Sequence, residues 1–247
     1  MKTLIFYILS VATLSGPNAA KILEAAGIDI DLSASSFPFM SMQEAHLGGL
    51  PVRIFRISFT GELSYEINVK ARHGLALWTL LMKAGADFGI TPYGTEAMHV
   101  LRAEKGFIIV GQETDGSVTP PDLNMNWIVS DVKADFIGKR ALARASMNYD
   151  DRKQLVGLMT TDSQRVIPEG AHAVIDPDQP MPMEMLGQVT SSYYSPNVGA
   201  SIAMAMLKGG HSMLGSKVYF PMLDGDVIEA EIVEPVFFDA KGERING

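Results

Sequence analysis

The sequence predicts an α+β fold arranged as two domains, residues 1–148 and residues 149–247. Before residue 148, segments that alternate apolar and polar residues, as strands do, are interspersed with segments of helical period. After the charged run at residues 149–153, short apolar segments separated by Gly, Pro and Asp predict a small antiparallel β-barrel.

Helices are expected in the first domain where apolar residues recur on one face. In residues 73–84 that face holds Leu77, Trp78, Leu81 and Met82, which we expect to point inward. The predicted helices are residues 17–26, 73–84, 95–105 and 138–146. The predicted strands are residues 52–59 and 63–69 in the first domain, and 154–160, 173–175, 187–192, 201–207, 217–221 and 227–233 in the second.

The start of the chain has two interpretations. Lys2, the apolar residues 4–14 and the small pair Ala19-Ala20 are typical of a secretory signal peptide. Alternatively, residues 4–14 form a buried strand that leads into a helix near Pro17. We favour the strand. No apolar stretch is both long enough and free enough of polar residues to predict a membrane span.

Composition excludes several kinds of function. The chain has no cysteine, which removes disulfides, thiolate metal sites and a cysteine nucleophile. Its formal net charge of -8 and the lack of a Lys/Arg cluster argue against nucleic acid as a partner. The five histidines show no ligand spacing, so we predict no metal site.

The most informative segment is residues 56–67, R-I-S-F-T-G-E-L-S-Y-E-I. Apolar and polar residues alternate on both sides of a turn at Gly61-Glu62, as in a strand pair. This alternation places Glu66 on the face opposite the core-facing Tyr65 and Ile67. A carboxylate only accepts hydrogen bonds, so its natural partner is a group with two parallel donors.

Residues 60–67, T-G-E-L-S-Y-E-I, and residues 97–106, A-M-H-V-L-R-A-E-K-G, resemble two patterns of the glycine-cleavage T-protein (aminomethyltransferase) family. The sequence of the second block is most similar to the C-terminal region of the heterotetrameric sarcosine oxidase alpha subunit. Further matches cover nearly the whole chain, at Ser15-Gly16-Pro17 and at residues 119–123, 135–139, 187–191 and 195–196. The resemblance implies an N-terminally incomplete folate-binding domain followed by a C-terminal β-barrel.

The resemblance also implies which residues bind tetrahydrofolate. Glu66 corresponds to the carboxylate that accepts two hydrogen bonds from the pterin, and Phe59 stands where relatives usually have a Tyr beside it. Tyr65 belongs to the same motif and is the third folate-binding candidate. Met98 and His99 depart from the Arg and Asp of the family pattern, which puts one ligand contact in doubt.

Two other residues of the second block do match the family, Arg102 and Glu104. We expect them to be structural, with local ion pairs along the helix as the alternative.

The implied reaction is transfer of a methylene unit from oxidised sarcosine to tetrahydrofolate, in the cytoplasm and beside other sarcosine oxidase subunits. Flavin is expected only on a partner subunit. The family's catalytic aspartate lies before Ser15-Gly16-Pro17, but residues 1–14 contain no acidic residue, so the catalytic residue is unknown. The alternative is a non-catalytic scaffold that keeps the fold for subunit contact.

Three short motifs suggest other chemistry but carry little weight. Residues 130–133 fit S-x-x-K without the partner motifs of that catalytic pattern. Residues 210–217 resemble a phosphate loop with Ser and Lys in reversed positions. Alternating methionines at residues 181–185 favour a flexible loop over a soft-metal site.

Overall fold

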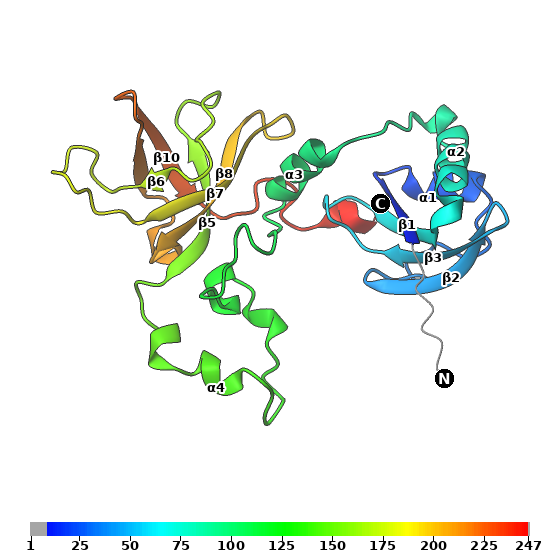
Figure 1. The fold of residues 1–247 in the computed structure, drawn as a ribbon, viewed down its shortest axis with the longest axis horizontal. Coiled ribbons are helices and arrows are strands. Elements are labelled where there is room, and N and C mark those ends of the chain that lie inside the picture. Colours follow the sequence, from blue (N-terminus) through cyan, green and yellow to red (C-terminus); the bar gives the residue numbers. More distant parts are fainter. Residues whose placement is uncertain (1–8, 247) are drawn as a thin grey trace. The chain divides into compact units, whose positions relative to one another are not determined.

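The computed structural model describes residues 9–246. The chain forms two compact units, residues 1–99 with 241–247, and residues 100–240 (Figure 1). In this division, residues 100–148 belong with the barrel strands, whereas the sequence-based boundary places them in the first domain.

The first unit is a four-stranded antiparallel sheet with the order β1-β4-β3-β2. Two helices pack on one face of this sheet, and the buried apolar side chains between the sheet and the helices form its core (Figure 1). The strands are β1 (Leu9–Ser15), β2 (Ser41–Leu47), β3 (Leu50–Arg56) and β4 (Ser64–Lys70), and the helices are α1 (Ala19–Ala25) and α2 (Gly74–Ala84).

The predicted elements of this unit are largely confirmed. β3 and β4 match the two predicted strands, and Leu9–Ser15 forms a strand as expected for that part of residues 4–14. Lys2 and residues 4–8 lie outside the described part of the chain. On α2, Leu77 and Leu81 are buried as predicted, but Trp78 is half exposed, so its predicted inward position is wrong.

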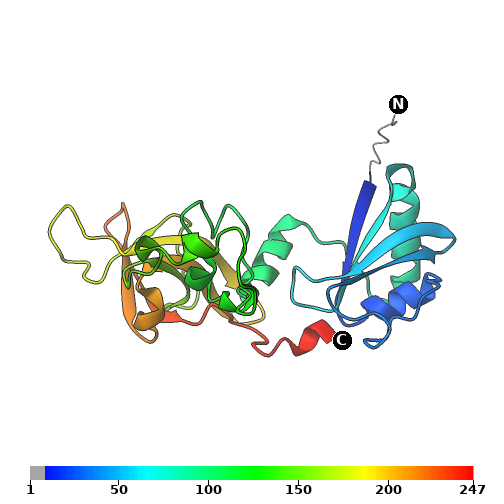
Figure 2. The ribbon, with the colours of Figure 1, turned by 90° about the horizontal axis from the view of Figure 1, so that it is seen from below.

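The second unit contains an antiparallel sheet with the order β6-β7-β8-β5-β10-β9. Val174, beside β6, exchanges backbone hydrogen bonds of 2.9 and 3.0 Å with Tyr219 of β9, which joins the two ends of the sheet. The predicted antiparallel barrel is therefore confirmed. Its strands are β5 (Lys153–Thr160), β6 (His172–Ala173), β7 (Gly187–Ser195), β8 (Ala200–Lys208), β9 (Lys217–Pro221) and β10 (Val227–Val233) (Figures 1 and 2).

Two further helices lie between the sheets in sequence. α3 (Thr95–Glu104) ends at Gly106, which has a φ of 66° as expected for a helix-terminating glycine. α4 (Lys139–Leu142) is shorter than the predicted helix over residues 138–146. Among residues 9–246, no helix has both the length and the apolar character needed to cross a bilayer.

Candidate functional site

Glu66 lies in the middle of β4, on the sheet face that points away from α1 and α2. It stands directly opposite Thr13 of β1 and Phe55 of β3. Its side chain is half-buried, and Oε1 accepts a hydrogen bond of 3.0 Å from Asn68 Nδ2. The neighbouring amide thus orients the carboxylate, which keeps further acceptor positions for another group.

The same face of the sheet carries apolar side chains around this carboxylate. Cross-strand pairing places Val11 opposite Asn68 and Met42 opposite Phe55, so all of them share the face of Glu66. Val11 and Met42 are about half exposed. An acidic group set among accessible apolar side chains suits a flat ring with hydrogen-bond donors on one edge.

Phe59 lies between β3 and β4, in the bend that leads to Gly61. Ser58 Oγ accepts a hydrogen bond from the Gly61 N–H (2.9 Å), and Gly61 has a φ of 81°, so this bend needs glycine. The Phe59 ring is 38% exposed and can contact a ligand.

Tyr65 is separated from the other two candidates. Its side chain is 1% exposed on the helix-covered face and stacks on Phe37 with ring centroids 6.0 Å apart. Burial raises the pKa of its hydroxyl. Because adjacent strand residues point to opposite faces, a ligand held by Glu66 does not share a face with the Tyr65 ring.

A hollow of about 630 Å³ lies beside β1 in the first unit. Its lining includes Thr13, the residue opposite Glu66, together with Trp78 and Met98, while Glu66 is one strand further in. Ser15 is hydrogen-bonded at this hollow to Ser64 (2.6 Å) and to the Tyr93 hydroxyl (3.3 Å). Ser15, Trp78 and Tyr93 were not among the predicted site residues, because Ser15 was noted only as part of the Ser15-Gly16-Pro17 match and no motif gave a site role to Trp78 or Tyr93.

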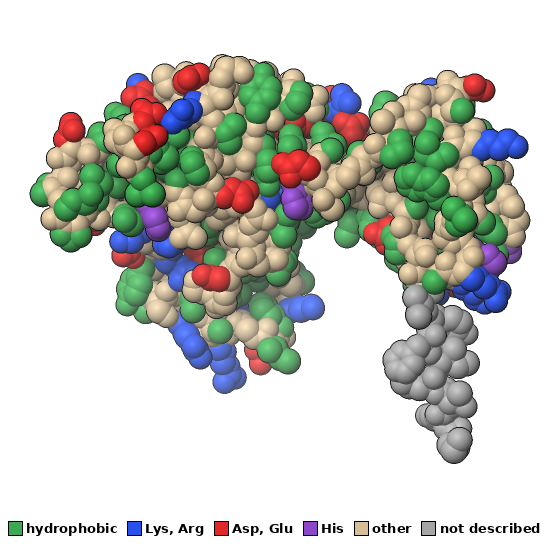
Figure 3. Space-filling view, turned by 45° about the horizontal axis from the view of Figure 1, so that its top comes forward, with side chains coloured by type: hydrophobic (Ala, Val, Ile, Leu, Met, Phe, Trp, Pro, Cys, Tyr) green, Lys and Arg blue, Asp and Glu red, His purple; other side chains and the backbone are tan. Residues whose placement is uncertain are grey.

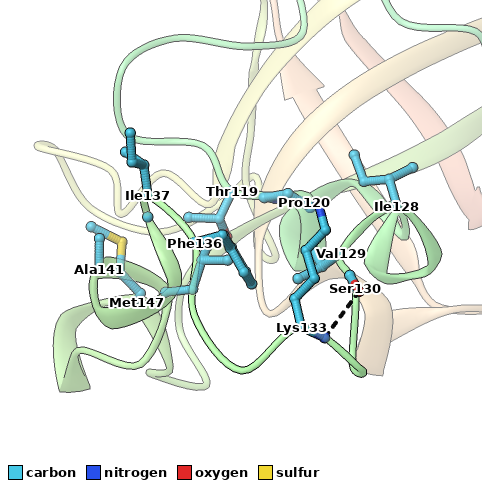
Figure 4. A pocket seen from close by; sticks show the side chains of 12 residues that line it. Thr119, Pro120, Ile128, Val129, Ser130, Lys133, Phe136, Ile137, Ala141 and Met147 are labelled. Atoms are coloured by element: carbon cyan, nitrogen blue, oxygen red, sulfur yellow. Dashed lines mark hydrogen bonds between the residues drawn. The ribbon is translucent and has the colours of Figure 1, made fainter.

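A second hollow, of about 440 Å³, lies in the second unit and is mostly apolar (Figure 4). In it, Ser130 Oγ accepts a hydrogen bond from the backbone N–H of Lys133 (3.3 Å). The S-x-x-K residues are therefore joined through a turn rather than through the lysine ammonium. Lys and Arg side chains gather on the surface around α4 (Figure 3).

Arg102 and Glu104 pair with polar side chains outside their own helix. Arg102 Nη1 lies 3.0 Å from Glu113 Oε2, and Arg102 Nη2 donates to Ser191 Oγ at 2.5 Å, all with buried side chains. Glu104 accepts hydrogen bonds from Ser195 Oγ (2.6 Å) and Asn197 Nδ2 (2.8 Å). The structural role predicted for both residues is confirmed, and the local ion-pair alternative is wrong.

The chain matches known protein families over most of its length. Residues 7–133 match the "GCVT N-terminal domain", and residues 153–239 match the "Glycine cleavage T-protein C-terminal barrel domain". The sarcosine oxidase alpha subunit of Corynebacterium sp. (strain U-96) is 43% identical over 97% of this chain and 25% of its own length. The aminomethyltransferase of Halothermothrix orenii is 32% identical over 92% of this chain and 60% of its own.

A solved structure agrees with these sequence matches. The glycine cleavage system aminomethyltransferase T from Bartonella henselae superposes with a TM-score of 0.78 at 25% identity, covering 94% of this chain and 60% of that protein. The sheet, the barrel and these matches define an aminomethyltransferase-like fold. The chain belongs to the glycine-cleavage T-protein family, and it spans about a quarter of the sarcosine oxidase alpha subunits it matches.

Proposed function

We propose that this chain binds tetrahydrofolate and acts as the one-carbon-transferring portion of a sarcosine oxidase alpha-like protein. The observation that carries the proposal is the Glu66 carboxylate, half-buried on the sheet face away from the helices and oriented by Asn68. A pterin presents an amide N–H and an amino group in parallel, which match two carboxylate acceptor positions. Phe59 offers an exposed aromatic ring for the same ligand.

Each residue has a defined task in this proposal. Glu66 accepts the two pterin hydrogen bonds, and Asn68 holds the carboxylate in place. Phe59 stacks on the ligand but lacks the hydroxyl that a Tyr would add. Tetrahydrofolate, when bound, supplies the amine nitrogens that take up the one-carbon unit, and the protein contributes by fixing their position.

Isothermal titration of tetrahydrofolate against the wild type and Glu66→Gln tests this proposal. A charge-assisted hydrogen bond is worth about 1.5–3 kcal/mol, so we expect Glu66→Gln to weaken binding about tenfold to a hundredfold. Glu44→Gln is the matched control, because Glu44 pairs with Arg53 on the same sheet face and is exposed. Equal binding by the wild type and Glu66→Gln, or no heat from either protein, contradicts the proposal.

The second candidate function is a scaffold for contact with other subunits, including one that carries flavin. It is favoured by the exposed apolar side chains of Trp127, Ile128, Val132 and Ile137 in the second unit. Met98 in place of the family's Arg also favours it. Absence of folate binding in the titration, together with an intact fold, is the outcome expected for a scaffold.

A further inference from the structure

The bend between β3 and β4, residues 57–63, carries Phe59 but is weakly held by the sheet. Pairing of the two strands ends at Phe55 and Glu66, so the ladder does not extend into the bend. Within residues 9–246, residues 57–62 form no hydrogen bond between backbone groups. The bond from the Gly61 N–H to Ser58 Oγ spans only part of the bend.

The bend still presents its residues in a defined way. Thr60, Gly61 and Leu63 are buried, whereas Phe59 is exposed. A segment without a ladder keeps such an orientation only through contacts with other parts of the structure.

The short turn η7 (Glu243–Asn246), drawn in red in Figure 1, makes such contacts within the first unit. Arg244 Nε donates a hydrogen bond to Glu62 Oε1, after Phe59 in the sequence. Before Phe59 in the sequence, Arg56 Nη2 lies 3.5 Å from the backbone oxygen of Asn246. The turn therefore contacts the chain on both sides of Phe59.

The Arg56 contact gives the turn a physical reason to stay in place. Arg56 is 2% exposed, and its Nη1 donates to the backbone oxygen of Phe37 at 2.9 Å. Within residues 9–246 this guanidinium has no carboxylate partner, and its Nε has no hydrogen-bond partner. Buried charged groups are costly without acceptors, so the backbone oxygen of Asn246 stabilises the docked turn.

The pair between Glu62 and Arg244 is partly open to solvent. The side chain of Arg244 is 47% exposed and that of Glu62 is 19% exposed. Ion pairs of this kind contribute little to global stability. Such a pair can nevertheless fix the position of a bend that has few hydrogen bonds of its own.

We propose that Glu62 and Arg244 are positioning residues for the ligand site, because their pairing holds the bend with Phe59 directed to the ligand. The inference rests on the proposed function, since the affected quantity is the affinity for tetrahydrofolate. Neither residue touches the ligand. A bend that is already held in place is not ordered at the expense of binding energy, so the affinity is higher.

Charge reversal with isothermal titration of tetrahydrofolate tests the role of the pair. Arg244→Glu and Glu62→Arg are each expected to weaken binding about threefold to tenfold, which is up to about 1.4 kcal/mol. The double variant is expected to recover most of the affinity, because opposite charges meet again. Denaturant midpoints of all variants are expected to stay close to that of the wild type, which separates positioning from folding.

The matched control is Arg165→Glu in the second unit. Arg165 is 46% exposed and pairs with Asp226 at 2.8 Å, so it resembles Arg244 in both respects. We expect Arg165→Glu to bind tetrahydrofolate like the wild type. Weaker binding by both single variants without recovery in the double variant overturns the pair as the cause.

Hydrogen exchange measured by mass spectrometry without tetrahydrofolate separates this inference from the proposed function. The amides of residues 57–62 are expected to exchange about threefold to tenfold faster in Arg244→Glu, and at the wild-type rate in the double variant. Those of β3 are expected to be unchanged. Faster exchange in the bend together with no binding by the wild type supports the hold on the bend and contradicts the proposed function.

Two other results overturn the inference. One is an unchanged exchange rate of residues 57–62 in Arg244→Glu. The other is equal affinity of Arg244→Glu and a wild type that does bind tetrahydrofolate, which leaves the proposed function standing.

Discussion

At the scale of single residues, the second unit depends on buried charges with distant partners. Arg102 is fully buried, and its guanidinium meets Glu113 at 3.0 Å and Ser191 at 2.5 Å. Ser191 Oγ in turn donates to Glu113 Oε1 at 2.5 Å. The three side chains come from α3, from the loop after it and from β7, so their network fastens this helix to the barrel.

Removing one charge from this network leaves the other buried without its partner. We predict that Glu113→Gln destabilises the protein by about 3–5 kcal/mol, because the Arg102 guanidinium stays buried. The measurement is denaturant unfolding followed by circular dichroism, with the exposed Glu169→Gln as control. A loss below about 1 kcal/mol would show that the pair contributes no more than a surface ion pair.

A second residue-scale prediction concerns pH. Burial raises the pKa of Asp122, but hydrogen bonds from Arg152 and Thr119 outweigh it and hold the pKa below its usual value. A lowered folded-state pKa gives stability that is present above the ordinary aspartate pKa of about 3.9 and lost as the pH falls through the folded-state value.

We therefore predict that Asp122→Asn costs about 3 kcal/mol at neutral pH, and that its difference from the wild type shrinks below about pH 4. Unfolding free energies measured over a pH series test this prediction. Asp131→Asn, at an exposed position, is expected to follow the wild type throughout. A constant difference between Asp122→Asn and the wild type down to acid pH rules out the proposed linkage.

At the scale of elements, the end of α3 requires a glycine. Gly106 has a φ of 66°, and a Cβ at this position would lie 2.3 Å from the backbone oxygen of Pro235. Gly111 also has a positive φ, 96°, but a Cβ there meets nothing within 4 Å. The two glycines therefore separate the cost of conformation from the cost of a clash with backbone.

We predict that Gly111→Ala costs about 1–2 kcal/mol for the left-handed conformation alone. Gly106→Ala costs more, because the backbone near Pro235 must also move. Thermal unfolding of the two variants against the wild type gives the comparison. If Gly106→Ala destabilises the protein no more than Gly111→Ala does, the backbone near Pro235 moves at little cost and does not hold α3 in place.

The bounds of helices and strands were more predictable from the sequence than the tertiary contacts of their side chains. β9 and β10 have the predicted bounds, because short apolar runs between turn residues define strands locally. β2 was missed because Gln43, Glu44 and His46 obscure its apolar alternation. The partners of Arg102 could not be predicted, since Ser191 is 89 residues away and no local pattern links them.

The candidate site was predictable in part for a related reason. The alternation around Glu66 fixed its face relative to Tyr65, and the structure has Tyr65 in the core as that alternation implies. The hollow beside β1 depends on Trp78 and Tyr93, which come from separate elements. Its existence follows from how β1, α2 and the segment before α3 pack, which no single stretch of sequence encodes.

At the scale of the whole molecule, the second unit is self-contained. Its two apolar clusters lie within residues 100–240, including Leu155, Ile202 and Met204, which pack with Ala103 and Leu123. The buried polar partners of Arg102 and Glu104 also lie within these residues. The last residues of the chain belong instead to the first unit, where Arg244 pairs with Glu62.

We predict that a polypeptide of residues 100–240 folds alone with a single cooperative unfolding transition, whereas residues 149–247 do not reach the same stability. The shorter piece lacks Arg102, Glu104 and Asp122, so it leaves Ser191 and Arg152 without these partners. It also exposes the apolar side chains of β8 that pack with Ala103 and Leu123. Calorimetry and amide NMR spectra of both pieces provide the measurement. Equal stability of the two pieces would show that residues 100–148 are dispensable for the barrel and would place the domain boundary near residue 149, as the sequence alone predicts.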